Sequence, residues 1–335
     1  MKIAVLGCGA IGGLFLGYLS KGPEDVLGVV RDYQKEPLEK EGLIIKTDTG
    51  RFEVKVKAGT TLAEPVDLAI FAVKTNDLET IVKENRPYLK NAIAVSTQNG
   101  VRADSILSNF FPEEKIVTAI VMFGATFCPP NKVIYNFPGK LVLGNIFGKK
   151  APYLGEAKKI LENSFNLEVK EAIKGAKYLK LFVNLNNCIP AVLGKPMQEV
   201  FKNLEAAELA IRLNREAYRV VKQAGISLES LPNYPKERIE KLVSMPAGES
   251  AQIFSKIMVN LSKEPLEGSI LQSIKRGKFS EIDYINGEIV KLAKDNNQKA
   301  PLNKKIVELV HRVEKKGFLS EEELLSKIKG AENEK

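Results

Sequence analysis

Gly7-Cys8-Gly9-Ala10-Ile11-Gly12 sets the fold of this chain because of the segments on either side of it. The apolar run Lys2-Ile3-Ala4-Val5-Leu6 comes directly before it and predicts a β-strand. Residues 13–20 follow with many apolar side chains and predict a helix that ends before Pro23. A second predicted strand at residues 26–30 completes a βαβ unit, whose helix N-terminus attracts phosphate.

The three glycines of the motif have separate physical roles. Gly7 permits a tight turn, Gly9 lets the backbone approach a pyrophosphate, and Gly12 allows the helix to pack closely on the strand. A turn without a ligand explains three glycines at this spacing poorly. We therefore predict that all six residues of the motif bind a dinucleotide: Gly7, Cys8, Gly9, Ala10, Ile11 and Gly12.

The residue that closes the second strand predicts which dinucleotide is bound. An acid at this point binds the ribose 2′-hydroxyl of NAD, whereas an arginine accommodates the 2′-phosphate of NADP. Arg31 follows the strand directly, so the sequence favours NADP(H). NAD(H) stays an alternative because Asp32 is the next residue, and a shift of one position would exchange their roles.

Further strands are predicted at residues 66–73 and 92–97, and they end near Lys74 and Asn99. Ligands of a doubly wound sheet bind outside the carboxyl ends of its strands, so we expect both side chains beside the glycine motif. The alternatives are a surface lysine and a turn asparagine, since Asn-Gly is a turn signal in its own right. Between these parts, residues 43–57 predict a hairpin as an elaboration on the parallel sheet.

The second half of the chain has helical periodicity throughout. We therefore predict an α/β protein: an N-terminal Rossmann-type doubly wound sheet domain at residues 1–172, then an all-α domain at residues 173–329. A polar tail at residues 330–335 is expected to fray. The predicted helices of the second domain are residues 171–189, 205–224, 236–243, 250–261, 280–296 and 301–316.

Composition excludes several classes of site. The 335 residues suit two domains, and the single histidine, His311, excludes zinc sites built on several histidines. Three scattered cysteines, Cys8, Cys128 and Cys188, favour free thiols in a reducing compartment. We predict no metal site, and acid–base chemistry then falls to lysine, a carboxylate, tyrosine or cysteine.

The charge and hydropathy patterns predict a cytoplasmic protein without nucleic-acid or membrane partners. The net charge of +9 comes from cations interspersed with acids, which is typical of a solvated surface. The apolar start imitates a signal peptide, but glycines interrupt it repeatedly. Elsewhere no run reaches the roughly 18–20 apolar residues that a membrane helix needs.

One predicted helix, at residues 177–188, carries an unusual polar stripe. Lys180, Asn184 and Asn187 are spaced i, i+4, i+7 and fall on one face, beside Cys188. The rest of this helix is strongly apolar, and asparagine is a poor helix former, so the stripe indicates a function. The alternative is a surface lysine with asparagines that satisfy buried backbone groups.

A second polar segment begins at Ser280. Ser280 and Asp283 have the spacing of a capping box, and Glu281 then falls in the first helical turn, where it complements the dipole. From the residues alone, helix initiation is the preferred interpretation.

Taken together, these motifs resemble the ketopantoate reductase (2-dehydropantoate 2-reductase) family over nearly the whole chain. The most specific segments are Lys180-Leu181-Phe182-Val183-Asn184 and Glu281-Ile282-Asp283-Tyr284-Ile285-Asn286-Gly287. The resemblance implies NADPH-dependent reduction of the 2-oxo acid ketopantoate to pantoate in pantothenate and coenzyme A biosynthesis. Two related dehydrogenase families, for 3-hydroxyisobutyrate and 6-phosphogluconate, share only the first segment.

The resemblance also implies roles for single residues. Lys180 would be the general acid, and Asn184 and Asn99 would position the substrate. Glu281 would contact both the substrate and Lys180 and keep the lysine charged, while Ser269 would bind the substrate carboxylate.

Three positions depart from the family pattern and leave the exact 2-oxo acid open. Cys188 stands where a second asparagine is common, and Asn186 or Asn187 can replace it only if the helix is locally shifted. Leu266 replaces an asparagine, and Ser273 replaces an acid.

Two other functions therefore stay open. The first is reduction of another branched 2-oxo acid by NADPH or NADH on the same fold. The second is a noncatalytic dinucleotide-binding sensor, which would not need Lys180 or Glu281. The oligomeric state is equally open, with a homodimer through the helical domain as one candidate.

Overall fold

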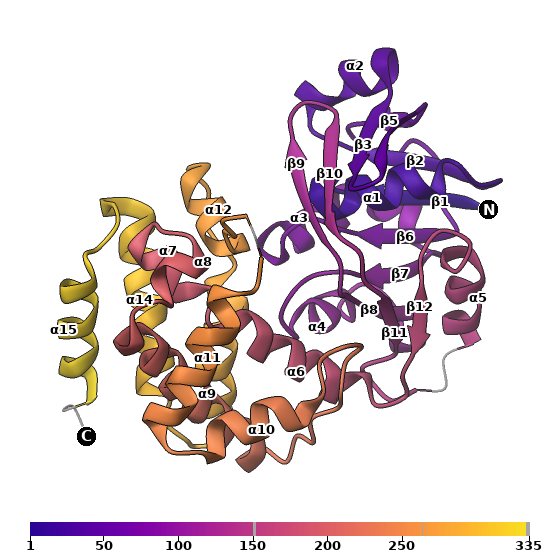
Figure 1. Cartoon of the computed structure of the whole chain (residues 1–335). Coiled ribbons are helices and arrows are strands. Elements are labelled where there is room, and N and C mark those ends of the chain that lie inside the picture. The colour runs from indigo at the N-terminus through magenta and orange to yellow at the C-terminus, as the bar shows by residue number, and fades with distance from the viewer. Residues whose placement is uncertain (150–151, 263, 333–335) are drawn as a thin grey trace. The chain divides into compact units, whose positions relative to one another are not determined.

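The computed structural model describes residues 1–149, 152–262 and 264–332. They form two compact units, Met1–Lys174 and Gly175–Lys335 (Figure 1). The first unit contains all the named strands, and the second is helical. This division matches the predicted order of a sheet domain followed by an all-α domain.

The first unit is built on an eight-stranded sheet with the order β12-β11-β8-β7-β6-β1-β2-β5. All neighbours pair in parallel except β8 and β11. The chain runs from β1 outward to β2 and β5, then returns to β6 on the other side of β1. This reversal is the topological switch point at which such sheets bind ligands. The strands are β1 (Lys2–Leu6), β2 (Asp25–Val29), β5 (Lys57–Gly59), β6 (Leu68–Phe71), β7 (Ile93–Ser96), β8 (Ile116–Val121), β11 (Leu141–Gly144) and β12 (Leu167–Val169).

Helices cover both faces of this sheet, which is why its strands are apolar on both sides. Ile3 and Val5 of β1 belong to a core with α1 and α5, whereas Ala4 and Leu6 belong to a separate core with α3 and α4. The doubly wound prediction is therefore confirmed. The helices of this unit are α1 (Ala10–Leu19), α2 (Asp32–Glu41), α3 (Thr75–Leu89), α4 (Ala103–Leu107), η1 (Glu113–Lys115) and α5 (Pro152–Leu161).

The predicted hairpin at residues 43–57 forms, but its two strands lie in a separate four-stranded sheet with the order β4-β3-β10-β9. This sheet packs on α1, where glycines leave room for it. A Cβ at Gly13 would lie 2.6 Å from Val133, and one at Gly17 would lie 2.3 Å from Ile45. The strands are β3 (Leu43–Thr47), β4 (Gly50–Val54), β9 (Gly124–Cys128) and β10 (Lys132–Phe137).

The second unit packs its helices around the long, amphipathic α9, which contacts α10, α11, α13 and α14. Its helices are α6 (Ile173–Leu185), α7 (Cys188–Leu193), α8 (Met197–Val200), α9 (Leu204–Gln223), α10 (Lys236–Ser244), α11 (Ala247–Val259), α12 (Ser269–Lys275), η2 (Ile282–Tyr284), α13 (Asn286–Asp295), α14 (Pro301–Lys316) and α15 (Glu321–Glu332). Within the described ranges, none of the helices is long and apolar enough to cross a membrane.

The single helix predicted at residues 171–189 is wrong, because α6 ends at Leu185 and α7 begins at Cys188. Pro190 explains the break: a proline inside a helix has no N–H for the carbonyl four residues earlier and its ring clashes with that carbonyl. For Pro190 this is the carbonyl of Asn186, which accepts instead from the N–H of Ile189 at 3.3 Å. Asn187 therefore does not continue the helical stripe of Lys180 and Asn184.

The capping box predicted at Ser280 is also wrong. The helix begins at Asn286, after the short 3₁₀ turn η2. The Ser280 hydroxyl accepts from the N–H of Ile282 at 3.4 Å, and the Asp283 carboxylate contacts His311. At the C-terminus, α15 continues to residue 332, and residues 333–335 of the predicted frayed tail lie outside the described residues.

The glycine motif offers a matched pair of substitutions that tests its packing. A Cβ at Gly12 would lie 2.1 Å from the Gly7 carbonyl oxygen, whereas a Cβ at Gly9 would meet no atom within 4 Å. Gly12→Ala should therefore lower the free energy of unfolding by about 1–3 kcal/mol through overpacking. Gly9→Ala should change it by less than about 0.5 kcal/mol, as for a surface substitution. Urea unfolding of both variants measures the difference, and equal losses would contradict the packing role of Gly12.

Candidate active site

The glycine loop lies at the carboxyl end of β1, at the switch point of the sheet. Gly7 has a φ of +95°, which side-chain-bearing residues rarely adopt, and its N–H donates to the Val29 carbonyl at 3.0 Å. Gly9 immediately precedes α1, whose first turn contains no acidic residue. Open space above Gly9 and the unneutralised positive end of α1 together form a cradle that fits a phosphate group.

Arg31 is exposed and lies between β2 and α2 with an extended backbone. Asp32, the other candidate for dinucleotide selection, is the first residue of α2, where its carboxylate complements the helix dipole. Gln34 connects this point to the glycine loop. Its buried amide donates to the Cys8 carbonyl at 3.0 Å and accepts from the Arg31 N–H at 3.3 Å.

Gln34 was not predicted from the sequence, although it lies three residues after Arg31, where a first-turn side chain can reach back to a preceding N–H. Its contact with Cys8 depends on the tertiary structure, since the two residues are 26 positions apart.

Lys74 and Asn99 follow neighbouring strands, as predicted. Lys74 caps the N-terminus of α3 directly after Val73, and Val73 is the residue against which Gly7 packs. The buried Gln98 amide donates to the carbonyls of Phe71 and Val73 at 2.8 and 3.0 Å, which joins the two loops. Lys74 and Asn99 are thus held on the same rim as the glycine motif, and both are partly exposed.

In the second unit, Lys180 and Asn184 lie four residues apart on α6 and are partly exposed. The residues around Lys180 on the helix, Leu179 and Leu181, are buried. Burial lowers the pKa of Lys180 from 10.5 to about 8. The expected role of Glu281 in keeping this lysine charged stays a prediction.

The end of α6 is tied to the segment that contains Glu281. The Leu185 carbonyl accepts from the Asn286 side chain at 3.2 Å and from the Cys188 thiol at 3.0 Å. Asn286 is the first residue of α13 and lies five residues after Glu281, which is itself partly exposed. A direct hydrogen bond thus joins the segment 281–287 to Leu185, the residue that follows the segment 180–184.

A buried amide network, which was not predicted from the sequence, extends this junction. Asn286 also donates to Asn303 at 3.0 Å, and Asn303 donates to Glu216 at 2.9 Å. On the other side, Asn214 donates to Asn186 at 2.9 Å. Asparagines within apolar helical segments were the available signal, but their pairing depends on the packing of α6, α9, α13 and α14.

Cys188 does not present its side chain as an asparagine would. It is fully buried, its thiol donates to the Leu185 carbonyl, and burial raises the pKa of the thiol to about 12. Asn187 instead packs against Gly268, where a Cβ would lie 3.0 Å from its Cγ. The local shift of the helix therefore brings Asn187 next to Ser269, which is exposed.

The other two departures from the family pattern take part in local structure. The Ser273 hydroxyl donates to the Ser269 carbonyl at 2.9 Å, within α12. Leu266 is held by its backbone, which donates to the Gln198 side chain at 2.9 Å and accepts from the Met197 N–H at 2.9 Å. Its partly exposed side chain adds an apolar group near this loop.

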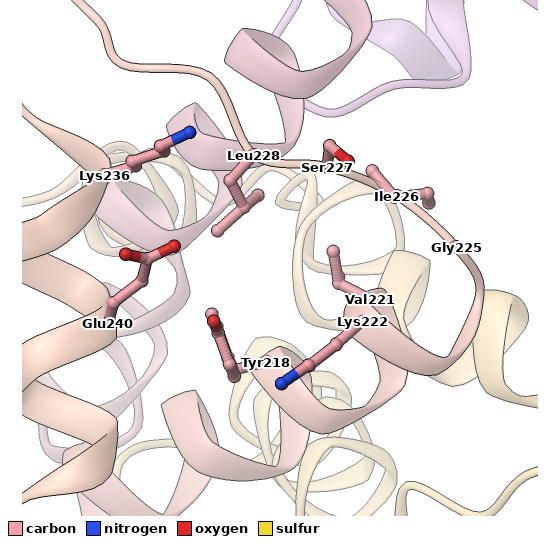
Figure 2. A pocket seen from close by; sticks show the side chains of 9 residues that line it. All are labelled: Tyr218, Val221, Lys222, Gly225, Ile226, Ser227, Leu228, Lys236 and Glu240. Carbon is pink, nitrogen blue, oxygen red and sulfur yellow. The ribbon is translucent and has the colours of Figure 1, made fainter.

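A pocket of about 300 Å³ lies in the second unit at the end of α9 and the start of α10 (Figure 2). Figure 2 shows the side chains of Lys222, Lys236 and Glu240 around it, with Tyr218 between them. None of the predicted site residues lines this pocket. It is separate from the candidate site.

Two family models match successive parts of the chain. Residues 3–148 match the one described as ketopantoate reductase PanE/ApbA, and residues 172–314 match the one for its C-terminal part. The chain belongs to the ketopantoate reductase family. It is 30% identical over 307 residues to the 2-dehydropantoate 2-reductase of Pyrococcus abyssi. The match covers 90% of this chain and 94% of the relative.

Two solved structures share the fold of this family member. A PanE/ApbA family ketopantoate reductase from Ralstonia eutropha JMP134 is 23% identical with a TM-score of 0.80, over 95% of this chain and 99% of the other. D-Mandelate dehydrogenase with NADH and anilino(oxo)acetate is 24% identical with a TM-score of 0.81, over 94% of this chain and 98% of the other. The family and the fold together make this protein an oxidoreductase with a dinucleotide-binding fold.

Removing the cation of Lys180 should stabilise this ketopantoate reductase family member in a pH-dependent way. The pKa is about 8 in the folded state and 10.5 otherwise, so the cost of the buried charge is complete below pH 8 and disappears as the pH approaches 10.5. Lys180→Met should therefore raise the free energy of unfolding at pH 7 by about 1–3 kcal/mol, with the lower end expected if solvent screens the charge.

Urea unfolding at pH 7 and pH 10 measures this effect, and the gain should be smaller at pH 10. Lys304→Met, at an exposed position of α14, is the control and should give no comparable gain. A gain that is equal at both pH values would contradict the lowered pKa of Lys180.

Proposed function

We propose that this protein reduces ketopantoate to pantoate with NADPH. The proposal rests on the lowered pKa of Lys180, which is about 8. Lys180 lies one helical turn before Asn184 in a member of the ketopantoate reductase family. A general acid is most effective when its pKa lies near the operating pH. Lys180 meets that condition, whereas an ordinary lysine does not.

The residues of the second unit would act on the substrate as follows. Lys180 donates its Nζ proton to the ketone oxygen as that oxygen becomes an alkoxide, and its positive charge stabilises the developing negative charge. Asn184, on the same face of α6, and Asn99 orient the carbonyl group. Ser269 binds the substrate carboxylate, and Glu281 contacts both substrate and lysine. Water then returns a proton to Lys180.

The first unit fits the dinucleotide, which supplies the hydride when bound. The cradle of residues 7–12 would hold the pyrophosphate, because the space above Gly9 is open and the N-terminus of α1 is unneutralised. Lys74 and Asn99 lie on the same rim. Arg31 supports NADPH because it is exposed at the end of the strand, while Asp32 is part of α2.

A more apolar 2-oxo acid is the second candidate substrate. Cys188 is buried and Leu266 contributes a hydrocarbon side chain, so two polar side chains of the family pattern are replaced at these positions. Ketopantoate carries a hydroxyl group that such a pocket would leave without a partner. A panel of ketopantoate, 2-oxoisovalerate and benzoylformate, each assayed with NADPH and NADH, separates the two candidates.

Lys180→Ala tests the proposed proton donor. We expect the rate of turnover of the oxo acid to fall by roughly 10²–10⁴-fold, since general acid catalysis contributes about that much. NADPH binding, followed by fluorescence, should be nearly unchanged because Lys180 lies in the helical unit. Turnover near the unmutated level would contradict the mechanism, and failure of the unmutated protein to reduce any acid of the panel would contradict the function.

Arg31→Gln tests the preference between the two dinucleotides. Because Arg31 is expected to pair with the 2′-phosphate, its loss should raise the KM for NADPH roughly tenfold while leaving the KM for NADH nearly unchanged. Lys35→Gln, at an exposed position of α2, controls for a general loss of positive charge. Equal effects of Arg31→Gln on both dinucleotides would contradict 2′-phosphate recognition.

A further inference from the structure

The only histidine of the chain has both ring nitrogens engaged by carboxylates. His311 lies on α14, with Nδ1 2.9 Å from the Glu314 carboxylate and Nε2 3.0 Å from the Asp283 carboxylate. The second oxygen of Glu314 accepts from the Ser280 N–H at 2.8 Å. Through α14, these contacts connect Ser280 with Asp283 and therefore span Glu281.

The chemistry of this arrangement favours the imidazolium form. An ionised carboxylate only accepts hydrogen bonds, and a neutral imidazole donates from just one nitrogen, so both bonds form only when His311 is protonated. Burial alone would lower the pKa of His311, but the hydrogen bonds and charges of Glu314 and Asp283 outweigh it and raise that pKa. The contacts are complete below this pKa and weaken as the pH rises through it.

Glu314 and Asp283 are the carboxylates that raise the pKa of His311, and several others on the elements packed against α14 have different partners. Glu216 of α9 accepts from the first N–H groups of α14, at Leu302 and Asn303. Glu323 of α15 accepts from the Ser320 N–H. Glu288 of α13 is buried, and its charge adds to the effect of burial in raising the pKa of Tyr178. The titratable group of α7 is the thiol of Cys188.

The segment that contains Glu281 has little regular structure of its own. It forms one short 3₁₀ turn, Ile282–Tyr284, with the N–H of Tyr284 donating to the Glu281 carbonyl at 3.0 Å. Short 3₁₀ turns have poor hydrogen-bond geometry and are weakly stable alone. Phe279, just before it, is exposed. The backbone at Glu281 thus lies between the contacts of Ser280 and Asp283 at the two ends of the turn.

We propose that His311 is a positioning residue, which bridges Asp283 and Glu314 and thereby holds residues 280–284 and the Glu281 carboxylate in their working orientation. The inference rests on the proposed function, in which Glu281 contacts substrate and Lys180. His311 itself touches neither. It acts through the backbone of the turn, and only its cationic form completes the bridge.

The bridge is testable without any substrate, because a single histidine gives a single set of imidazole signals in NMR. The titration should give a pKa above 6.5, and Asp283→Asn or Glu314→Gln should each lower it. Glu308→Gln is the matched control, since it removes a carboxylate of α14 three residues on the other side of His311 that pairs with Lys305. A titration that none of the variants shifts would overturn the bridge.

Amide hydrogen exchange tests whether the bridge holds the turn. Exchange in residues 280–285 should accelerate in His311→Ala but not in Glu308→Gln. If exchange is equally fast in the unmutated protein and in His311→Ala, the proposal is overturned. These two measurements remain decisive even if the protein reduces no 2-oxo acid, in which case only the proposed function fails.

Kinetics then separates positioning from a purely structural role. His311→Ala should lower kcat/KM for the oxo acid about tenfold, because small displacements of a substrate-contacting group are costly, while leaving the KM for the dinucleotide unchanged. His311→Arg should restore kcat/KM to within about twofold, since its forked cation can bridge two carboxylates. At pH values above the pKa of His311, kcat/KM of the unmutated enzyme should fall below that of His311→Arg. Unchanged kcat/KM in His311→Ala, or no rescue by arginine, would overturn the inference.

Discussion

A Cβ at residue 12 would overlap the carbonyl oxygen of Gly7, and the rest of the first unit depends on this contact. It allows α1 to begin directly at the end of β1, so that the helix N-terminus and the carboxyl ends of β1 and β6 meet at one point. The same helix then needs Gly13 and Gly17 to admit the second sheet. Gly12 therefore allows the close contact at the ligand-binding end of β1, and Gly13 and Gly17 allow α1 to pack against the second sheet.

The second unit depends in a similar way on the interruption between α6 and α7. Pro190 prevents one continuous helix, and the Leu185 carbonyl at the break accepts hydrogen bonds from Cys188 and Asn286. This junction connects the lysine helix to the segment of Glu281, and it directs Asn187 towards the loop of Ser269. An unbroken helix would have kept Asn187 on the stripe with Lys180 and left α13 without its anchor on α6.

The sequence was informative where structure follows from local patterns. The glycine motif, the alternation of strands and helices and the apolar helices are local features, and they predicted both the doubly wound sheet and the helical second unit. The second sheet could not be predicted, because β3 pairs with β10 some 88 residues later, as in Ile44 with Lys132. Gln34, Asn286 and the bridge from Asp283 to His311 depend on tertiary contacts in the same way. At Ser280, the local capping pattern was present, but the contacts of Ser280 and Asp283 with Glu314 and His311 of α14 prevailed.

The distribution of titratable groups connects these local facts with the proposed chemistry. With one histidine in the chain, and that histidine held between two carboxylates, the proton donor has to come from another residue type. In the proposed mechanism Lys180 supplies it, because burial lowers its pKa from 10.5 to about 8. The two groups shift in opposite directions, yet both are protonated on the acidic side of their pKa values. In the proposed mechanism, reduction therefore needs the same condition twice: a proton on Lys180 to donate, and a proton on His311 to hold the turn on which Glu281 lies.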